Sequence, residues 1–178
     1  MAIASTIFKV ELGVSDMDRH YYQTHNLTLA RHPSETDSRL MLRLLVFALY
    51  ADEYLTYGAG ISSDDEPDLW IKSLTGETEL WIDLGLPSEK RIRQACGKSN
   101  QIVLLCYGAR SAMPWWKQME RRVKRFENLK IYFCGDDNLT ALTELCKHNM
   151  QLQCGIQDGA IWMNADSKNV GLQLQTWK

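Results

Sequence analysis

The sequence has few of the residue patterns that mark zinc, disulfide or nucleotide sites. Its five cysteines include no Cys-x-x-Cys pair, and their odd number suits neither a zinc ribbon nor a disulfide framework. Its four histidines form no His-Glu-x-x-His motif, which argues against a zinc enzyme of that kind. No glycine-rich phosphate loop of the P-loop or dinucleotide-binding type is present. Carboxylates and basic side chains remain as the candidate functional groups.

Long apolar runs and a strong net charge are also missing. The longest apolar stretches are well short of a membrane span, and Met1 to Leu12 lacks the apolar block of a signal peptide. We therefore expect a cytoplasmic protein with reduced core cysteines and no membrane association. The formal net charge of -2 argues against coating nucleic acid with a uniformly basic surface, but it permits a local basic groove.

The 178 residues, 45% of them hydrophobic and 24% charged, suit one globular domain over residues 1–178. Strict alternation over 6–12 and 21–30 predicts an antiparallel hairpin near the N-terminus. Alternation from Met150, with a turn at Asp158-Gly159, predicts a second hairpin near the C-terminus. Because half-buried hairpins need an apolar partner, we expect the two hairpins to form a second, mainly antiparallel sheet.

The middle of the chain predicts a mixed sheet flanked by helices, and the fold class is α/β (α+β). The expected order begins with a helix capped by Ser34, a short edge strand or loop over 57–61, and strands over 67–71 and 79–85. A helix capped by Ser88, a strand over 101–108, a helix capped by Ser111 and a strand over 130–135 follow. The alternation of strands and helices from 79 onward predicts parallel pairing.

The stretch from Asp64 to Arg93 holds the main candidate site. Asp68 enters one apolar run, and Asp83 ends the next. Antiparallel pairing of these strands would place both carboxylates on one face. Magnesium or manganese prefers such hard oxygen ligands, and a neighbouring Lys90 or Arg91 would supply a cation for phosphodiester hydrolysis. Two ordinary strand ends beside a solvated helix would give the same pattern.

Two charged rows each allow a structural and a functional interpretation. Glu35, Arg39 and Arg43 recur at helical spacing, either as an exposed salt-bridged stripe or with Glu35 at the edge of an active site. A second row is either a solvated helix face or a set of phosphate contacts, and it comprises Lys117, Arg121, Lys124 and Arg125.

The sequence resembles the YaeQ family of small bacterial proteins, essentially from end to end. The resemblance is carried by Leu-Thr-Leu-Ala-Arg-His-Pro-Ser-Glu-Thr (27–36), Met-Leu-Arg-Leu-Leu (41–45), Tyr-Ala-Asp-Glu (50–53), Asp-Asp-Glu-Pro (64–67), Leu-Trp-Ile (80–82), Leu-Gly-Leu-Pro (84–87) and Ile-Gln-Asp-Gly (156–159). It implies the restriction-endonuclease-like fold of the PD-(D/E)XK group, with an αβββαβ core.

This resemblance also implies roles for individual residues. Glu35 matches the helix glutamate of the group, Pro67-Asp68 matches its Pro-Asp pair, and Asp83-Leu84-Gly85 matches its (D/E)xK tripeptide. Gly85 stands where the catalytic lysine belongs. Fold relatives sometimes supply that cation from the following helix, which here carries Lys90 and Arg91.

Two functions stay open on this basis. The first is a Mg²⁺- or Mn²⁺-dependent nuclease, with Asp68, Asp83 and Glu35 as metal ligands and Lys90 or Arg91 as the catalytic cation. The second is a catalytically inactive protein of the same fold that serves as a nucleic-acid-binding or protein-interaction module. A fold alone does not distinguish them.

Overall fold

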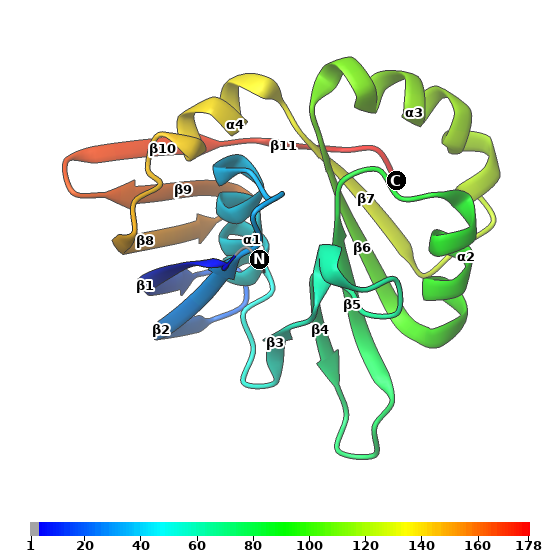
Figure 1. Ribbon diagram of the computed structural model, residues 1–178, viewed down its shortest axis with the longest axis horizontal. Helices are drawn as coiled ribbons and strands as arrows, with labels where there is room; N and C mark the ends of the chain where they lie inside the picture. The colour runs from blue at the N-terminus through cyan, green and yellow to red at the C-terminus, as the bar shows by residue number, and fades with distance from the viewer. Residues whose placement is uncertain (1–3) are drawn as a thin grey trace. The chain divides into compact units, whose positions relative to one another are not determined.

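The structure is a computed structural model that describes residues 4–178. Within these residues the chain forms four α-helices and two mixed β-sheets (Figure 1). The chain divides into two compact units, which we call the hairpin unit (residues 4–51 and 137–173) and the crossover unit (52–136 and 174–178). The organisation as one domain over 1–178 stays a prediction. No helix in the described part of the chain is long and apolar enough to span a membrane.

The hairpin unit is built on a five-stranded sheet that contains both terminal hairpins. Its strand order is β10-β9-β8-β1-β2, with β1 (Thr6–Asp16), β2 (Tyr21–Arg31), β8 (Asn149–Gln157), β9 (Ala160–Ala165) and β10 (Lys168–Leu172). The central β1 pairs antiparallel with β2 and parallel with β8. The expectation that the hairpins share one sheet is therefore confirmed.

Alternation along β1 determines which face of this sheet is buried. Phe8, Val10 and Leu12 are buried, whereas Lys9 and Glu11 are exposed. Helix α1 (Asp37–Leu49) packs against β1 and is apolar around most of its circumference, so that nearly all its side chains after Arg39 are buried. The predicted Asp158-Gly159 turn joins β8 to β9, and the Asp18 carboxylate accepts both of its backbone N–H groups, at 2.7 and 3.0 Å.

The crossover unit is built on a six-stranded sheet of order β11-β7-β6-β5-β4-β3. Its strands are β3 (Leu55–Tyr57), β4 (Leu69–Lys72), β5 (Thr78–Leu84), β6 (Ser99–Tyr107), β7 (Leu129–Cys134) and β11 (Leu174–Thr176). Strands β5, β6 and β7 are parallel, as predicted, and are linked by α2 (Glu89–Lys98) and α3 (Ala109–Val123). The predicted edge strand or loop over 57–61 is β3 followed by a short 3₁₀ helix, Gly60–Ser62.

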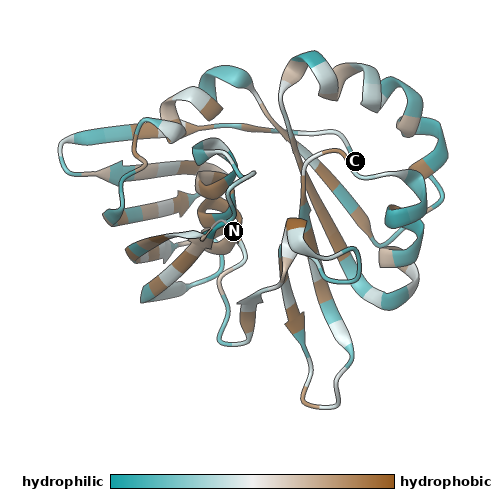
Figure 2. Ribbon diagram, viewed as in Figure 1, coloured by the Kyte–Doolittle hydropathy of each residue, from teal (hydrophilic) through white to brown (hydrophobic). Residues whose placement is uncertain are grey.

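An apolar layer joins α2 and α3 to the parallel strands. Ile92 and Ala95 of α2 and Met119 and Val123 of α3 are buried in the same cluster as the alternate side chains of β6 and β7. Both helices therefore turn their polar side chains outward, which Figure 2 shows as mainly hydrophilic helices beside more hydrophobic strands.

Two helix starts differ from the predictions. Thr36, rather than Ser34, caps α1, because its side chain accepts the Arg39 backbone N–H, whereas the Ser34 hydroxyl bonds to the His32 ring at 2.6 Å. Helix α3 begins at Ala109 instead of after Ser111, and the Asp136 side chain accepts the Ala109 N–H at 3.0 Å. The Ser88 cap of α2 is confirmed by the hydrogen bond that it accepts from the Arg91 N–H.

The chain near its C-terminus contributes one strand to each of the two sheets. Strand β10 belongs to the hairpin unit, whereas β11 pairs antiparallel with β7 in the crossover unit. The break falls at Gln173, whose carbonyl accepts the side chain of Asn138 at 2.8 Å. Asn138 itself lies inside α4 (Asp136–Thr143). Alternation marks both strands but does not reveal which sheet each one joins.

Candidate functional site

Strands β4 and β5 bring Asp68 and Asp83 together, as their sequence pattern predicts. Leu69 pairs with Ile82 in the antiparallel register, and the Asp68 N–H donates to the Ile82 carbonyl at 3.0 Å. Asp68 therefore lies opposite Asp83 on the same face of the sheet. The two residues are only 3% and 4% exposed. A buried carboxylate is costly unless hydrogen bonds or an ion pair stabilise its charge.

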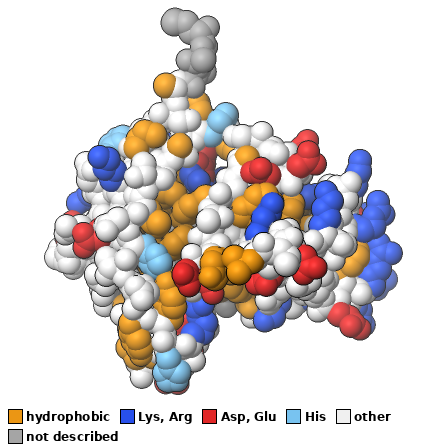
Figure 3. All heavy atoms as spheres, turned by 90° about the horizontal axis from the view of Figure 1, so that it is seen from below, with side chains coloured by type: hydrophobic (Ala, Val, Ile, Leu, Met, Phe, Trp, Pro, Cys, Tyr) orange, Lys and Arg blue, Asp and Glu red, His pale blue; other side chains and the backbone are white. Residues whose placement is uncertain are grey.

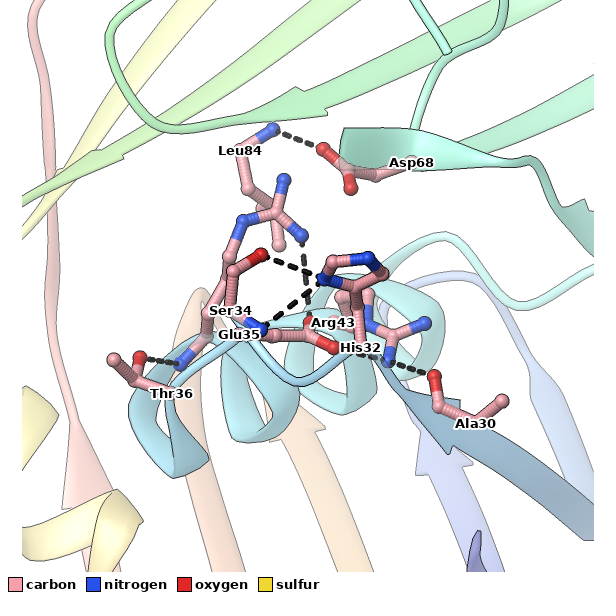
Figure 4. A network of polar contacts seen from close by, with 9 residues as sticks. Ala30, His32, Ser34, Glu35, Thr36, Arg43, Asp68 and Leu84 are labelled. Atoms are coloured by element: carbon pink, nitrogen blue, oxygen red, sulfur yellow. Dashed lines mark hydrogen bonds and ion pairs between the residues drawn. The ribbon is translucent and has the colours of Figure 1, made fainter. Parts of the chain in front are cut away.

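Backbone groups of the neighbouring strand and loop hold the Asp68 carboxylate. Its Oδ2 accepts the Leu84 N–H at 2.8 Å (Figure 4). Its Oδ1 lies so close to Gly60 that a Cβ there would come within 2.6 Å of it. Gly60 also has a φ of +55°, which L-residues rarely adopt. A glycine at this position therefore permits the loop to lie directly against the carboxylate.

Arg91, from the first turn of α2, forms a two-pronged ion pair with Asp83. Its Nε lies 2.8 Å from Asp83 Oδ2, and its Nη2 lies 3.1 Å from Oδ1. The same guanidinium donates to the carbonyls of Asp64 and Glu66, at 2.7 and 3.0 Å. Hydrogen bonding to Asp83 raises the pKa of Arg91, against the opposing effect of burial. Four hydrogen bonds thus fix this side chain, which is an arrangement that the planar guanidinium suits.

Of the two cations that the sequence suggests, the structure brings Arg91 to the carboxylates. Lys90 is exposed on α2. Gly85, which replaces the lysine of the motif, has a φ of +105°, a backbone conformation that is strained for a lysine. The position after Leu84 therefore suits glycine, and the positive charge reaches Asp83 from the next helix.

The carboxylate oxygens of Asp68 and Asp83 already accept hydrogen bonds in this arrangement, so a magnesium ion would have to compete with Arg91 for Asp83. Mg²⁺ needs free oxygen ligands in near-octahedral geometry. Both Asp83 oxygens are bonded to Arg91, and Asp68 Oδ2 is bonded to the Leu84 N–H. Across residues 4–178, no three His, Cys, Asp or Glu side chains gather in a group that could hold a metal ion.

Glu35 lies in the hairpin unit, where two arginines surround it (Figure 4). Its Oε1 lies 2.8 Å from Arg43 Nε and 3.4 Å from Arg39 Nη1, and its Oε2 accepts from Arg43 Nη2 at 2.8 Å. The predicted salt-bridged row therefore exists, but it is not an exposed stripe, because Glu35 is 6% exposed and both arginine side chains are 11% exposed. Asp68 and Asp83 belong to the crossover unit.

Sequence reasoning missed the backbone part of this site. The carbonyls of Asp64 and Glu66 anchor Arg91, and the Glu66 side chain accepts the Ala59 N–H at 2.8 Å. A carbonyl ligand leaves no signature in residue type, since every residue has one. The one sequence feature that could have indicated this contact is the acidic segment from Asp64 to Glu66. Its loop is held near the site by these hydrogen bonds.

The fold and this site define a mixed α/β protein with two mixed sheets and a buried aspartate pair closed by an arginine. A family model described as "YaeQ protein" matches residues 1–174, and the chain belongs to the YaeQ family. It is 43% identical over 178 residues to the "Uncharacterized protein YaeQ" of Salmonella typhi and 41% identical to that of Escherichia coli (strain K12). In both comparisons the match covers all of this chain and 98% of the relative.

Two solved structures are similar over nearly their whole length. The crystal structure of the YaeQ protein from Xanthomonas axonopodis pv. citri is 46% identical, with a TM-score of 0.93 and 97% of each chain covered. That of the YaeQ protein from Pseudomonas syringae is 33% identical, also with a TM-score of 0.93, and the match covers 98% of this chain and 96% of the other.

Proposed function

We propose that the protein is a non-cutting member of the restriction-endonuclease-like PD-(D/E)XK fold group, and that it acts by binding nucleic acid. The observation that carries this proposal is the ion pair between Arg91 and Asp83. In this interpretation the guanidinium takes the place that a metal ion has in an active nuclease. It neutralises Asp83 permanently, because an arginine does not lose its proton in a protein.

The order of elements supports the assignment to this fold group. Strands β3, β4 and β5, then α2 and β6, follow one another as the resemblance implies for the αβββαβ core after its first helix, and α3 and β7 come after them. Asp68 precedes β4 directly, and Asp83 stands near the end of β5. These are the positions at which the Pro-Asp pair and the (D/E)xK tripeptide stand in the group.

A comparison of free energies favours the arginine over a metal ion. Removing one partner from a buried, hydrogen-bonded charge pair costs about 2–5 kcal/mol. A site that binds its metal with a millimolar dissociation constant gains only about 4 kcal/mol. A metal ion at Asp83 would have to displace Arg91 and leave that guanidinium with the two carbonyls alone. A metal ion whose intrinsic gain at Asp83 is only about 4 kcal/mol would therefore bind with little net free energy, because displacing Arg91 costs about as much.

A Mg²⁺- or Mn²⁺-dependent nuclease is the second candidate, with Asp68, Asp83 and Glu35 as ligands. One specific observation favours it, namely that Arg91 supplies a positive charge from the helix after β5. That is the position from which fold relatives are implied to replace the missing lysine. The two candidates share Asp68, Asp83 and Arg91, and they differ in whether Arg91 excludes the metal ion or acts beside it.

The distribution of charge favours nucleic acid over a protein partner. Residues 89–125 contain ten of the 20 lysines and arginines but only two of the 22 acidic residues. A net charge of -2 for the whole chain therefore conceals a strongly basic segment. Phosphate backbones are the partners that such local fields attract most strongly.

A cleavage assay tests this proposal. Plasmid DNA, a single-stranded oligonucleotide and an RNA hairpin are incubated with millimolar Mg²⁺ or Mn²⁺ and with wild type, Asp83→Asn or Lys90→Ala. We expect no cleavage above the level of Asp83→Asn with any substrate. Cleavage by wild type that disappears in Asp83→Asn and weakens in Lys90→Ala would overturn the proposal in favour of the nuclease.

A further inference from the structure

The basic residues of 89–125 lie on one layer of the crossover unit. Helices α2 and α3 lie side by side, because Glu89 of α2 pairs with Arg122 at 3.3 Å and with Arg125 at 3.5 Å. Their apolar side chains face the sheet, and the cations other than Arg91 face outward. Figure 3 shows lysine and arginine side chains gathered along its right-hand edge, the side on which Figure 1 places these two helices.

Most of these cations have no acidic partner. We call the exposed, unpaired basic residues of the two helices the α2–α3 ridge, and they are Lys90, Arg93, Lys98, Arg110, Lys117, Arg121 and Lys124. None of them forms an ion pair within residues 4–178. Glu89 already lies between two arginines, and Glu120 is the other acidic residue on these helices. The ridge therefore carries a positive charge that the protein does not neutralise itself.

The spacing along α3 places its cations in one row. Lys117, Arg121 and Lys124 are separated by four and three residues, which puts them on one face of a helix. From Arg110 to Lys124 the row extends roughly 21 Å, at 1.5 Å of rise per residue. A duplex carries one negative charge per roughly 1.7 Å of its axis, so a segment of this length presents many phosphates to the row.

A hollow lies at the end of the ridge, between the end of α2 and the residues that follow α3. Its volume is about 590 Å³, and its walls include Arg93 of α2, Arg125 just after α3, Glu127 and Asn128. The Asn128 side chain is fixed by hydrogen bonds to the carbonyls of Cys96 and Ser99, both at 3.0 Å. Arg93 is the unpaired cation of this hollow, because Arg125 already pairs with Glu89 and the acidic Glu127 also lines it.

The ridge is positively charged but has few exposed aromatic side chains that could stack on bases and few exposed apolar side chains that could insert into a membrane. The nearby tryptophans stack on one another, with ring centres 6.4 Å apart for Trp115 and Trp116 and 5.3 Å apart for Trp116 and Trp177, so they are not presented as platforms for unpaired bases. On α2 and α3, both fully described, Met113 is the one large apolar side chain that is mostly outside the core, at 40% exposure. A membrane-binding helix would expose several.

We propose that the α2–α3 ridge binds the phosphate backbone of double-stranded nucleic acid without reading its sequence. This inference rests on the proposed function and names its surface and its ligand. Each lysine or arginine that contacts a phosphate releases condensed counterions, so binding weakens as salt is raised. The slope of log K against log [salt] changes by about one for each contact that is lost.

The test uses the full chain and a fluorescein-labelled DNA duplex of random sequence in EDTA. The ridge variant carries Lys117→Glu, Arg121→Glu and Lys124→Glu. The matched control carries Lys9→Glu, Lys130→Glu and Lys168→Glu, which changes the net charge by the same amount at exposed lysines outside the ridge. All six positions are exposed, and circular dichroism with thermal unfolding verifies that both variants fold. Affinity is measured by anisotropy across a range of salt concentrations.

We expect the ridge variant to lose at least a hundredfold in affinity at low salt and its salt slope to fall by about three. The control variant keeps the slope and stays within about threefold of wild type. Equal losses in both variants, or none in the ridge variant, would overturn the ridge while leaving nucleic-acid binding itself intact. Absence of duplex binding by wild type would overturn both proposals. Cleavage in Mg²⁺ with ridge-dependent binding in EDTA would overturn only the proposed function.

Two further probes test the class of ligand. A single-stranded oligonucleotide of equal length that binds more tightly than the duplex would contradict a duplex backbone as the ligand. Vesicles containing phosphatidylserine that bind as tightly as the duplex, and with the same dependence on the ridge, would show that the surface recognises anions in general. We expect both probes to bind at least tenfold more weakly than the duplex.

Discussion

At the scale of single residues, the main result concerns Arg91. Sequence reasoning placed Asp68, Asp83 and a cation of the next helix in one site, because strand alternation and the start of α2 are visible in residue types. It left Lys90 and Arg91 as alternatives, and the structure brings Arg91 to Asp83. The choice depends on backbone carbonyls at Asp64 and Glu66, which no pattern of side chains reveals.

Removing the guanidinium should therefore destabilise the fold. We expect Arg91→Ala to lower the free energy of unfolding by about 2–4 kcal/mol, since it leaves a buried carboxylate and two carbonyls without their donor. Arg91→Lys should recover part of this loss, because one ammonium cannot make all four hydrogen bonds. The control is Arg93→Ala, at an exposed ridge residue, which should change the free energy of unfolding by less than about 0.5 kcal/mol. Urea unfolding measures all three, and similar losses for Arg91→Ala and Arg93→Ala would contradict this role.

His25 gives the hairpin unit a dependence on acid. Burial lowers the pKa of His25, whose Nε2 bonds to the Tyr21 hydroxyl at 2.8 Å and whose ring meets Phe47 edge-on. Below the ordinary histidine pKa of about 6.5, the unfolded chain therefore binds the proton more readily than the folded one. We expect stability to fall as the pH drops from 7 to 5, and to fall less steeply in His25→Gln. The urea midpoint of unfolding is measured at several pH values for both proteins. If it depends on pH equally in wild type and His25→Gln, His25 is not the source of the acid sensitivity.

At the scale of elements, boundaries were harder to predict than the elements themselves. The apolar periodicity of α1 identified the helix, but two hydroxyl residues precede it at cap-like spacing. Thr36 is the cap, and Ser34 instead bonds to His32. Likewise Val170, Leu172 and Leu174 alternate in the sequence, but this pattern does not reveal the change of sheet at Gln173. Local patterns record which face is buried, whereas caps and sheet membership depend on groups distant in sequence.

The two candidate caps of α1 can be separated by mutation. We expect Thr36→Ala to cost about 1 kcal/mol of stability, because the Arg39 N–H loses its acceptor at the helix start. Ser34→Ala removes a hydroxyl from an exposed position outside the helix and should cost less than about 0.5 kcal/mol. Thermal or urea unfolding of both variants measures the difference. A larger loss for Ser34→Ala than for Thr36→Ala would contradict this assignment.

At the scale of the whole molecule, the sequence predicted the sheet composition well. Pairing of the two terminal hairpins, and the parallel arrangement of β5, β6 and β7, are both confirmed. These features follow from the need to bury half-apolar strands, which residue types record directly. The division into two compact units was not predicted, because the chain passes between them without a stretch rich in proline, glycine or serine.

The basic residues are distributed unevenly over the whole chain. The chain is slightly acidic overall, yet half of its lysines and arginines lie in residues 89–125. The proposed function uses both features of the crossover unit, an arginine that closes the acidic site and a basic ridge on the helices of the same layer. The claim common to both is that Asp83 is already neutralised by Arg91, so the protein binds nucleic acid without a metal ion and without cutting it.

Calorimetric titration of Mg²⁺ and Mn²⁺ into wild type and Asp83→Asn tests this claim most directly. We predict that neither protein gives a saturating heat up to millimolar metal, and that the two titrations are the same. A saturable heat in wild type that is absent from Asp83→Asn would show that a metal ion displaces Arg91. That result would contradict the account.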